Sequence, residues 1–167
     1  MFLFLAFFWL QSAVPQQLPL ARQHLKRGHE LSQKGDLKSA ESELRQAVKL
    51  APNDAVGLAL LGTVLFRQEK LAEAGAYFEK ALELDPSDSG TRYNLAVNYY
   101  RLNRPEKARE ALTGFLHHPA APETVFQGAK AASYAGDFDT AEKLLESIRS
   151  TYPDKVKLGY ELALVQY

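Results

Sequence analysis

Residues 55–88 read AVGLALLGTVLFRQEKLAEAGAYFEKALELDPSD, two apolar-periodic stretches joined by a charged turn. In the first stretch, Leu58, Leu61 and Leu65 recur at the spacing that places side chains on one face of an α-helix. Ala74 and Phe78 follow the same spacing in the second stretch. The segment therefore predicts two short amphipathic helices that pack against each other.

The same pattern recurs along the chain every 34 residues, and once after 33. One position of the repeating unit always holds a small residue: Ala40, Ala74, Ala108 and Ala141. Another always holds a large apolar residue: Leu44, Phe78, Leu112 and Leu145. A single helix pair cannot bury both of its apolar faces, so neighbouring pairs must stack. We predict an all-α solenoid of antiparallel helix pairs, with repeats at 21–54, 55–88, 89–121 and 122–155 and a partial repeat at 156–167.

These recurring positions resemble the signature of the tetratricopeptide repeat (TPR) family. Repeat two matches it most fully, at Leu61-Gly62, Ala74, Phe78 and Pro86. The resemblance implies a right-handed α-solenoid with a concave groove. It also implies a non-enzymatic scaffold that binds a segment of a partner protein in that groove.

The groove of this family is lined by the first helix of each repeat. Carried over position by position, the expected partner-binding residues are Ala59, Thr63, Phe66, Arg67, Tyr93, Asn94, Val97, Tyr100, Arg101, Phe126, Gln127, Lys130 and Tyr134. In this interpretation the aromatic side chains supply apolar contact, and Arg67, Arg101 and Lys130 favour an acidic flank. The alternative is that the aromatic residues only pack against neighbouring helices.

Composition and motifs argue against most other functions. Lys and Arg number 20 and so do Asp and Glu, which disfavours a dedicated nucleic-acid binder. The chain has no cysteine, which excludes disulfides, cysteine-bound zinc and thiol catalysis. Neither a phosphate-binding glycine loop nor a nucleophile motif occurs, and His29 lacks the second histidine of a zinc-protease motif because Gln33 stands there. We therefore expect no enzymatic activity, no cofactor and no metal.

The N-terminus is separate in character from the repeats. Residues 2–10 are nine apolar residues in a row, too short to span a membrane but of the length of a signal-peptide core. We expect residues 1–13 to be a signal peptide, or an uncleaved apolar anchor, and residues 14–20 to be a linker. An exported protein, periplasmic or secreted, follows from this interpretation.

Two regions depart from the regular pattern. In repeat three, Gly114 and Phe115 precede the turn that contains His117, so we expect the second helix to end early and the packing on repeat four to be looser. At the other departure, Tyr160 and Leu164 lie in an apolar final helix. An apolar edge predicts either a fragment of a longer array or self-association as a weak homodimer through 156–167.

Overall fold

The computed structural model describes residues 3–118 and 120–166, with side chains from residue 17 onward. Within these residues it contains α-helices and one 3₁₀ helix and no strand, so the predicted all-α class is confirmed. The helices are α1 (Leu3–Gln33), α2 (Leu37–Leu50), α3 (Ala55–Arg67), α4 (Leu71–Leu84), α5 (Ser89–Arg101), α6 (Pro105–Thr113), η1 (Gly114–Leu116), α7 (Pro122–Tyr134), α8 (Phe138–Ser147) and α9 (Lys155–Gln166).

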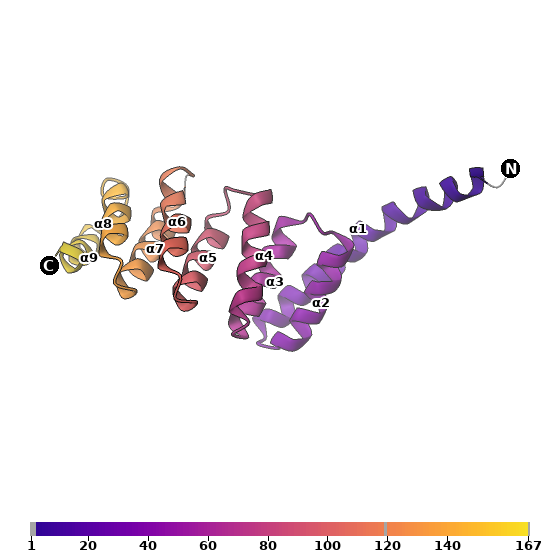
Figure 1. Ribbon diagram of the computed structural model, residues 1–167, viewed down its shortest axis with the longest axis horizontal. Coiled ribbons are helices and arrows are strands. Elements are labelled where there is room, and N and C mark those ends of the chain that lie inside the picture. The colour runs from indigo at the N-terminus through magenta and orange to yellow at the C-terminus, as the bar shows by residue number, and fades with distance from the viewer. Residues whose placement is uncertain (1–2, 119, 167) are drawn as a thin grey trace.

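The helices stack side by side into an elongated array that runs from α1 at one end to α9 at the other (Figure 1). Each odd-numbered helix from α1 to α7 packs on the even-numbered helix that follows it. The pairs then pack on one another, chiefly through α2 with α3 and α4 with α5. This arrangement is the predicted solenoid of helix pairs.

The turns inside the helix pairs need a residue in the left-handed conformation. Gly35 and Gly136 have φ angles of 84° and 79°, and Asn103 has a φ of 56°. Glu69 occupies the same place in repeat two with a φ of 64°, although it carries a side chain that disfavours this conformation. Its presence there suggests that the Glu69 carboxylate has a use of its own.

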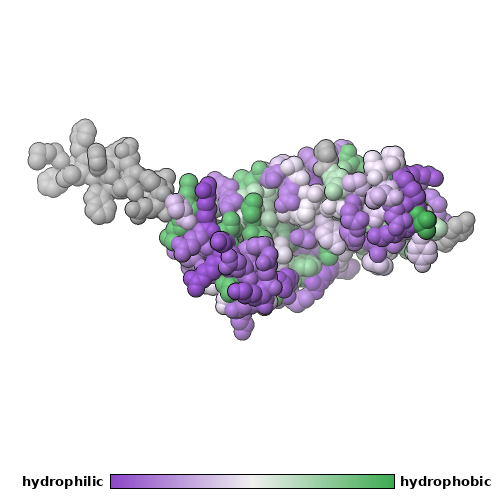
Figure 2. All heavy atoms as spheres, turned by 180° about the vertical axis from the view of Figure 1, so that it is seen from behind, coloured by the Kyte–Doolittle hydropathy of each residue, from purple (hydrophilic) through white to green (hydrophobic). Residues whose placement is uncertain are grey.

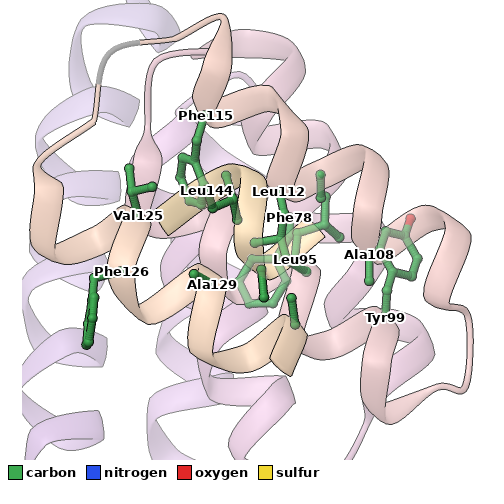
Figure 3. Close-up of a cluster of buried hydrophobic side chains, with 14 of the residues drawn as sticks. Phe78, Leu95, Tyr99, Ala108, Leu112, Phe115, Val125, Phe126, Ala129 and Leu144 are labelled. Carbon is green, nitrogen blue, oxygen red and sulfur yellow. The ribbon is translucent and has the colours of Figure 1, made fainter. Parts of the chain in front are cut away.

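A continuous apolar core runs through the array, and Figure 3 shows the part of it around α4 to α8. Close approach within the pairs depends on the small residues found in the sequence. A β-carbon on Gly62 would lie 2.7 Å from the Phe78 ring, and one on Gly28 would lie 2.6 Å from Leu44. The recurring small and large residues are therefore complementary halves of the same contact.

Repeat three departs from the others as its sequence predicts. α6 ends at Thr113 and the chain continues as the 3₁₀ helix η1, so the early helix end is confirmed. Repeat four still packs on repeat three, but by a different helix: α7 contacts α5 of repeat three more than it contacts α6. Phe115 is buried, and a β-carbon on Gly128 of α7 would lie 2.9 Å from its ring.

The N-terminal stretch differs from its expected form. α1 passes without a break through residues 14–20, so the stretch expected to be a linker has a helical backbone. The side chains of the expected signal segment, residues 1–13, lie outside the described residues. Among the described helices, none combines the length and the apolar character needed to cross a membrane.

Candidate functional site

A cavity of about 400 Å³ opens between α5 and α7, on the face formed by the first helices of repeats three and four. We call it the aromatic cavity. Its lining residues are Tyr93, Val97, Tyr100, Arg101, Gln127, Lys130, Ala131, Tyr134 and Ala135.

The structure brings together seven of the thirteen residues predicted for the groove. Ala131 and Ala135 also line the cavity and were missed, although each follows a predicted or lining residue of α7 by one helical turn. Asn94 lies on α5 but does not line the cavity. The other predicted residues of α3 lie outside it: Ala59, Thr63, Phe66 and Arg67.

Phe126 does not face this surface, and its predicted place there is wrong. Its side chain is fully buried and its ring stacks on Tyr152, with 4.6 Å between the ring centroids. Tyr152 lies in the turn that follows α8, and its hydroxyl donates a hydrogen bond to Glu123 at 2.8 Å. The turn residue folds back onto α7 and covers the side that the repeat pattern assigns to solvent.

Tyr100 contributes its ring to the cavity while its hydroxyl is already bonded. The hydroxyl donates to the Asp137 carboxylate at 3.2 Å, and Arg109 pairs with the same carboxylate at 3.1 Å. Burial, together with the charge of Asp137, raises the pKa of Tyr100 above its ordinary value. Asp137 in turn accepts a hydrogen bond from the Thr140 backbone at the start of α8. This hydroxyl therefore links repeat three to repeat four, and its proton is already donated within the fold.

Tyr134 is the most accessible aromatic residue of the cavity. It is 81% exposed, and the Lys130 ammonium lies 5.5 Å from the centre of its ring. Lys130 also lies 3.7 Å from a Glu161 carboxylate oxygen. An exposed aromatic ring that makes a cation–π contact with a neighbouring lysine can bind an apolar group of a partner.

Arg101 stands at the opposite side of the cavity and is held in place from repeat two. It forms an ion pair with Glu69 across the repeats, and its guanidinium lies 4.8 Å from the centre of the Phe66 ring. The Glu69 side chain thus joins the turn of repeat two to repeat three from a left-handed backbone position.

Arg67 and Thr63 are engaged within the fold. Arg67 donates to the Ser32 carbonyl at 2.8 Å and to the Ser32 hydroxyl at 3.0 Å, which joins α3 to the end of α1. The Thr63 hydroxyl donates to the Ala59 carbonyl of its own helix at 2.9 Å. Of the cations expected to select an acidic flank, Arg101 and Lys130 are paired with carboxylates, and Arg67 is held outside the cavity by neutral oxygens. The cavity itself therefore offers chiefly apolar contact.

The possible metal ligands in the part of the chain that the structure describes are His, Asp and Glu side chains. No group of three or more His, Asp or Glu side chains gathers there in an arrangement that could hold an ion.

Comparisons with known proteins agree with this architecture. Models of the tetratricopeptide repeat family match residues 25–89, 65–131 and 123–155. A peroxisomal targeting signal receptor from Candida glabrata is 28% identical in an alignment of length 133, which covers 70% of this chain and 22% of the receptor. The chain therefore spans about a fifth of the length of that relative.

Solved structures share the fold. The crystal structure of MamA superposes with a TM-score of 0.70 at 18% identity, over 87% of this chain and 80% of MamA. YrrB, a TPR protein with an unusual peptide-binding site, superposes with a TM-score of 0.65 at 22% identity, over 85% of this chain and 74% of YrrB. At these identities the likeness concerns the fold alone.

Proposed function

Because the chain belongs to the tetratricopeptide repeat family, whose fold commonly mediates protein–protein interaction, we propose that it is a non-enzymatic scaffold that binds a partner protein in the aromatic cavity. The observation that carries the proposal is the cavity itself, with Tyr134 exposed at its edge. The partner contributes an apolar side chain, which the Tyr93, Val97 and Tyr100 side chains receive.

The experiment compares two exposed tyrosines. Tyr134→Ala removes an aromatic ring of the cavity, whereas Tyr160→Ala removes a 65% exposed ring on α9, outside the cavity. A partner captured from the source organism with the unaltered chain is identified, and its affinity for each variant is measured by calorimetry. We expect Tyr134→Ala to weaken binding by about 1–3 kcal/mol and Tyr160→Ala to leave it unchanged. Equal binding by both variants would overturn the proposal.

Tyr100→Ala is a poorer test, since it also removes the hydrogen bond to Asp137. Tyr100→Phe keeps the ring in the cavity and removes only the hydroxyl. If the ring is what the partner contacts, Tyr100→Phe retains binding while lowering the free energy of unfolding by about 1 kcal/mol.

The proposal extends to location. The apolar run at residues 2–10 supports export, so the scaffold would work in the cell envelope or outside the cell. N-terminal sequencing of the protein recovered from its source checks this. A start near Val14, or an intact chain in the membrane fraction, supports export, whereas intact Met1 on chain from the cytosolic fraction contradicts it.

A second candidate function is self-association through α9. Val156, Tyr160 and Leu164 are spaced four residues apart, and all three are exposed, which makes one apolar stripe on this helix. Sedimentation of the unaltered chain and of Val156→Lys over a range of concentrations tests this. A dimer lost in the variant supports the candidate, and a monomer at the highest concentration contradicts it.

A further inference from the structure

The second helices of the repeats form an outer face, and two successive junctions on that face differ. The first outer junction lies between α2 and α4, and the second lies between α4 and α6. Residues that occupy equivalent places in the two junctions are 34 positions apart in the sequence, so each side chain of one has a counterpart in the other.

At the first outer junction, large side chains fill the space between the helices. Arg45 donates to Glu41 at 2.8 Å and to Glu73 at 2.7 Å, and also reaches the Tyr77 hydroxyl at 3.4 Å. Lys70 donates to the second oxygen of Glu41 at 2.7 Å. The Glu41 side chain is only 14% exposed as a result.

At the second outer junction, the two filling side chains are missing. The counterpart of Tyr77 is Ala111, and the counterpart of Glu41 is Gly75. A cleft of about 440 Å³ opens beside Ala111, and we call it the outer cleft. Its lining residues are Glu79, Leu82, Glu83, Arg92, Leu95, Tyr99, Lys107, Glu110 and Ala111, none of which lines the aromatic cavity.

The two cations of the outer cleft are engaged within the fold, Lys107 by a carboxylate and Arg92 by a neutral carbonyl. Arg92 donates to the Pro86 carbonyl and packs over Gly114, where a β-carbon would collide with its guanidinium. Lys107 lies 3.8 Å from Glu79, which also accepts the Tyr99 hydroxyl.

Two carboxylates of the cleft form no direct ion pair within the described part of the chain. Glu83 and Glu110 take part in no ion pair or hydrogen bond from a side chain among the residues described, and both are exposed. The lining carries three carboxylates and two cations. The cleft therefore combines an apolar floor, formed by Leu82, Leu95 and Ala111, with an excess of one negative charge.

We propose that the outer cleft is a second docking surface, which takes from a partner protein an aromatic side chain next to a lysine or arginine. The aromatic ring lies over Ala111, in the place that Tyr77 fills at the preceding junction. The neighbouring cation pairs with Glu83 and Glu110. Because this surface shares no residue with the aromatic cavity, its occupation does not depend on the function proposed above.

The test uses short peptides of known sequence as probes. An acetylated and amidated peptide with Tyr-Lys at its centre and Gly-Ser flanks is added to the full chain, and backbone amide shifts are followed by NMR. We expect saturable shifts at Leu82, Tyr99 and Ala111 at low-millimolar concentration, which is the range for one anchoring side chain. Peptides with Tyr-Glu or Ala-Lys at the centre should bind at least about tenfold more weakly.

Two variants complete the test. Ala111→Tyr restores the side chain of the first outer junction, so it should abolish the shifts while the chain stays folded. Glu110→Gln should weaken the Tyr-Lys peptide by about two- to fivefold. It should not weaken the Tyr-Glu peptide, because it removes a like charge. The proposal is overturned if no saturable shift reaches the cleft, if the shifts persist in Ala111→Tyr, or if the Tyr-Glu peptide binds equally well.

Discussion

The two sides of α4 meet equivalent neighbours in different ways. Toward α2 the outer layer is closed by Arg45, whose guanidinium bonds to carboxylates of both helices. Toward α6 the outer layer is open over Ala111. Beneath both sides the core is continuous, and the Phe78 side chain of α4 is fully buried.

This difference separates two layers of the repeat. The inner layer obeys the 34-residue period because each repeat must bury its neighbour. The outer layer is free to be filled by the chain itself or left for another molecule. Figure 2 shows one face of the molecule, on which hydrophilic residues gather over the α1–α2 end of the array and hydrophobic residues reach the surface in separate patches.

The largest effect is expected where the two junctions share their core. Phe78→Ala removes a fully buried ring that packs on Gly62. The truncation therefore leaves a cavity in the core. We expect the free energy of unfolding to fall by about 3–5 kcal/mol in urea titrations. A loss below about 1 kcal/mol would mean that the inner layer is not continuous beneath α4.

The next effect distinguishes the first outer junction, which Arg45 closes, from the second outer junction, which is open over Ala111. We call them the closed and the open junction. Arg45→Met breaks bonds to two carboxylates and should destabilise the chain by about 1–2 kcal/mol. Lys107→Met is the matched control at the open junction, because Lys107 is half exposed and its contacts are long: 3.8 Å to Glu79 and 5.3 Å to the centre of the Tyr99 ring. Its effect should stay within about 0.5 kcal/mol. Equal losses, measured by thermal unfolding at low salt, would show that the junctions do not differ energetically.

A third variant replaces a buried polar side chain of α5, Asn98, which lies against Gly75 of the open junction. Asn98 is fully buried, and neither polar atom of its side chain has a hydrogen-bond partner among the described residues. Its counterpart 34 residues earlier is the buried Val64. Asn98→Val should therefore raise the free energy of unfolding by about 1 kcal/mol. A lower midpoint in guanidinium would indicate that the amide has a partner in solution, such as a bound water.

The smallest effect is the pH dependence of the closed junction. Burial alone would raise the pKa of Glu41, but hydrogen bonds from Lys70 and Arg45 outweigh it and lower the pKa to about 2, from 4.5. Since the folded-state pKa lies below the unfolded one, the stabilisation is complete above pH 4.5 and is lost as the pH falls toward 2. Glu41→Gln should flatten the stability curve in this window, by under about 1 kcal/mol. Glu83→Gln, at the open junction, serves as the control.

The fold could be predicted because its determinant is periodic. The positions of Ala74 and Phe78 recur in every repeat as a small and a large apolar residue, so sequence spacing alone predicts the helix pairs and their core. The turn glycines were also readable, since Gly35 and Gly136 are the residues that the left-handed conformation favours. The left-handed conformation of Glu69 could not be predicted, because glutamate does not favour it and its ion pair with Arg101 joins two repeats.

The site was predictable only in part, for reasons that lie outside the period. Phe126 occupies a groove position in the repeat, but Tyr152 reaches it from an irregular turn whose path no spacing specifies. The hydroxyl of Tyr100 is taken by Asp137 of the next repeat, a contact that depends on how the pairs stack. The outer cleft could have been found in the sequence by comparing Tyr77 with Ala111, at equivalent positions of successive repeats.

The contacts between neighbouring helices also determine how the chain can fold during its synthesis. The main partners of every described helix lie one or two elements away along the chain, as α5 lies against α4, α6 and α7. A chain with such local contacts closes only short loops as it folds. During synthesis each new helix therefore meets a neighbour that has already left the ribosome, and the array can grow in the order in which it is translated.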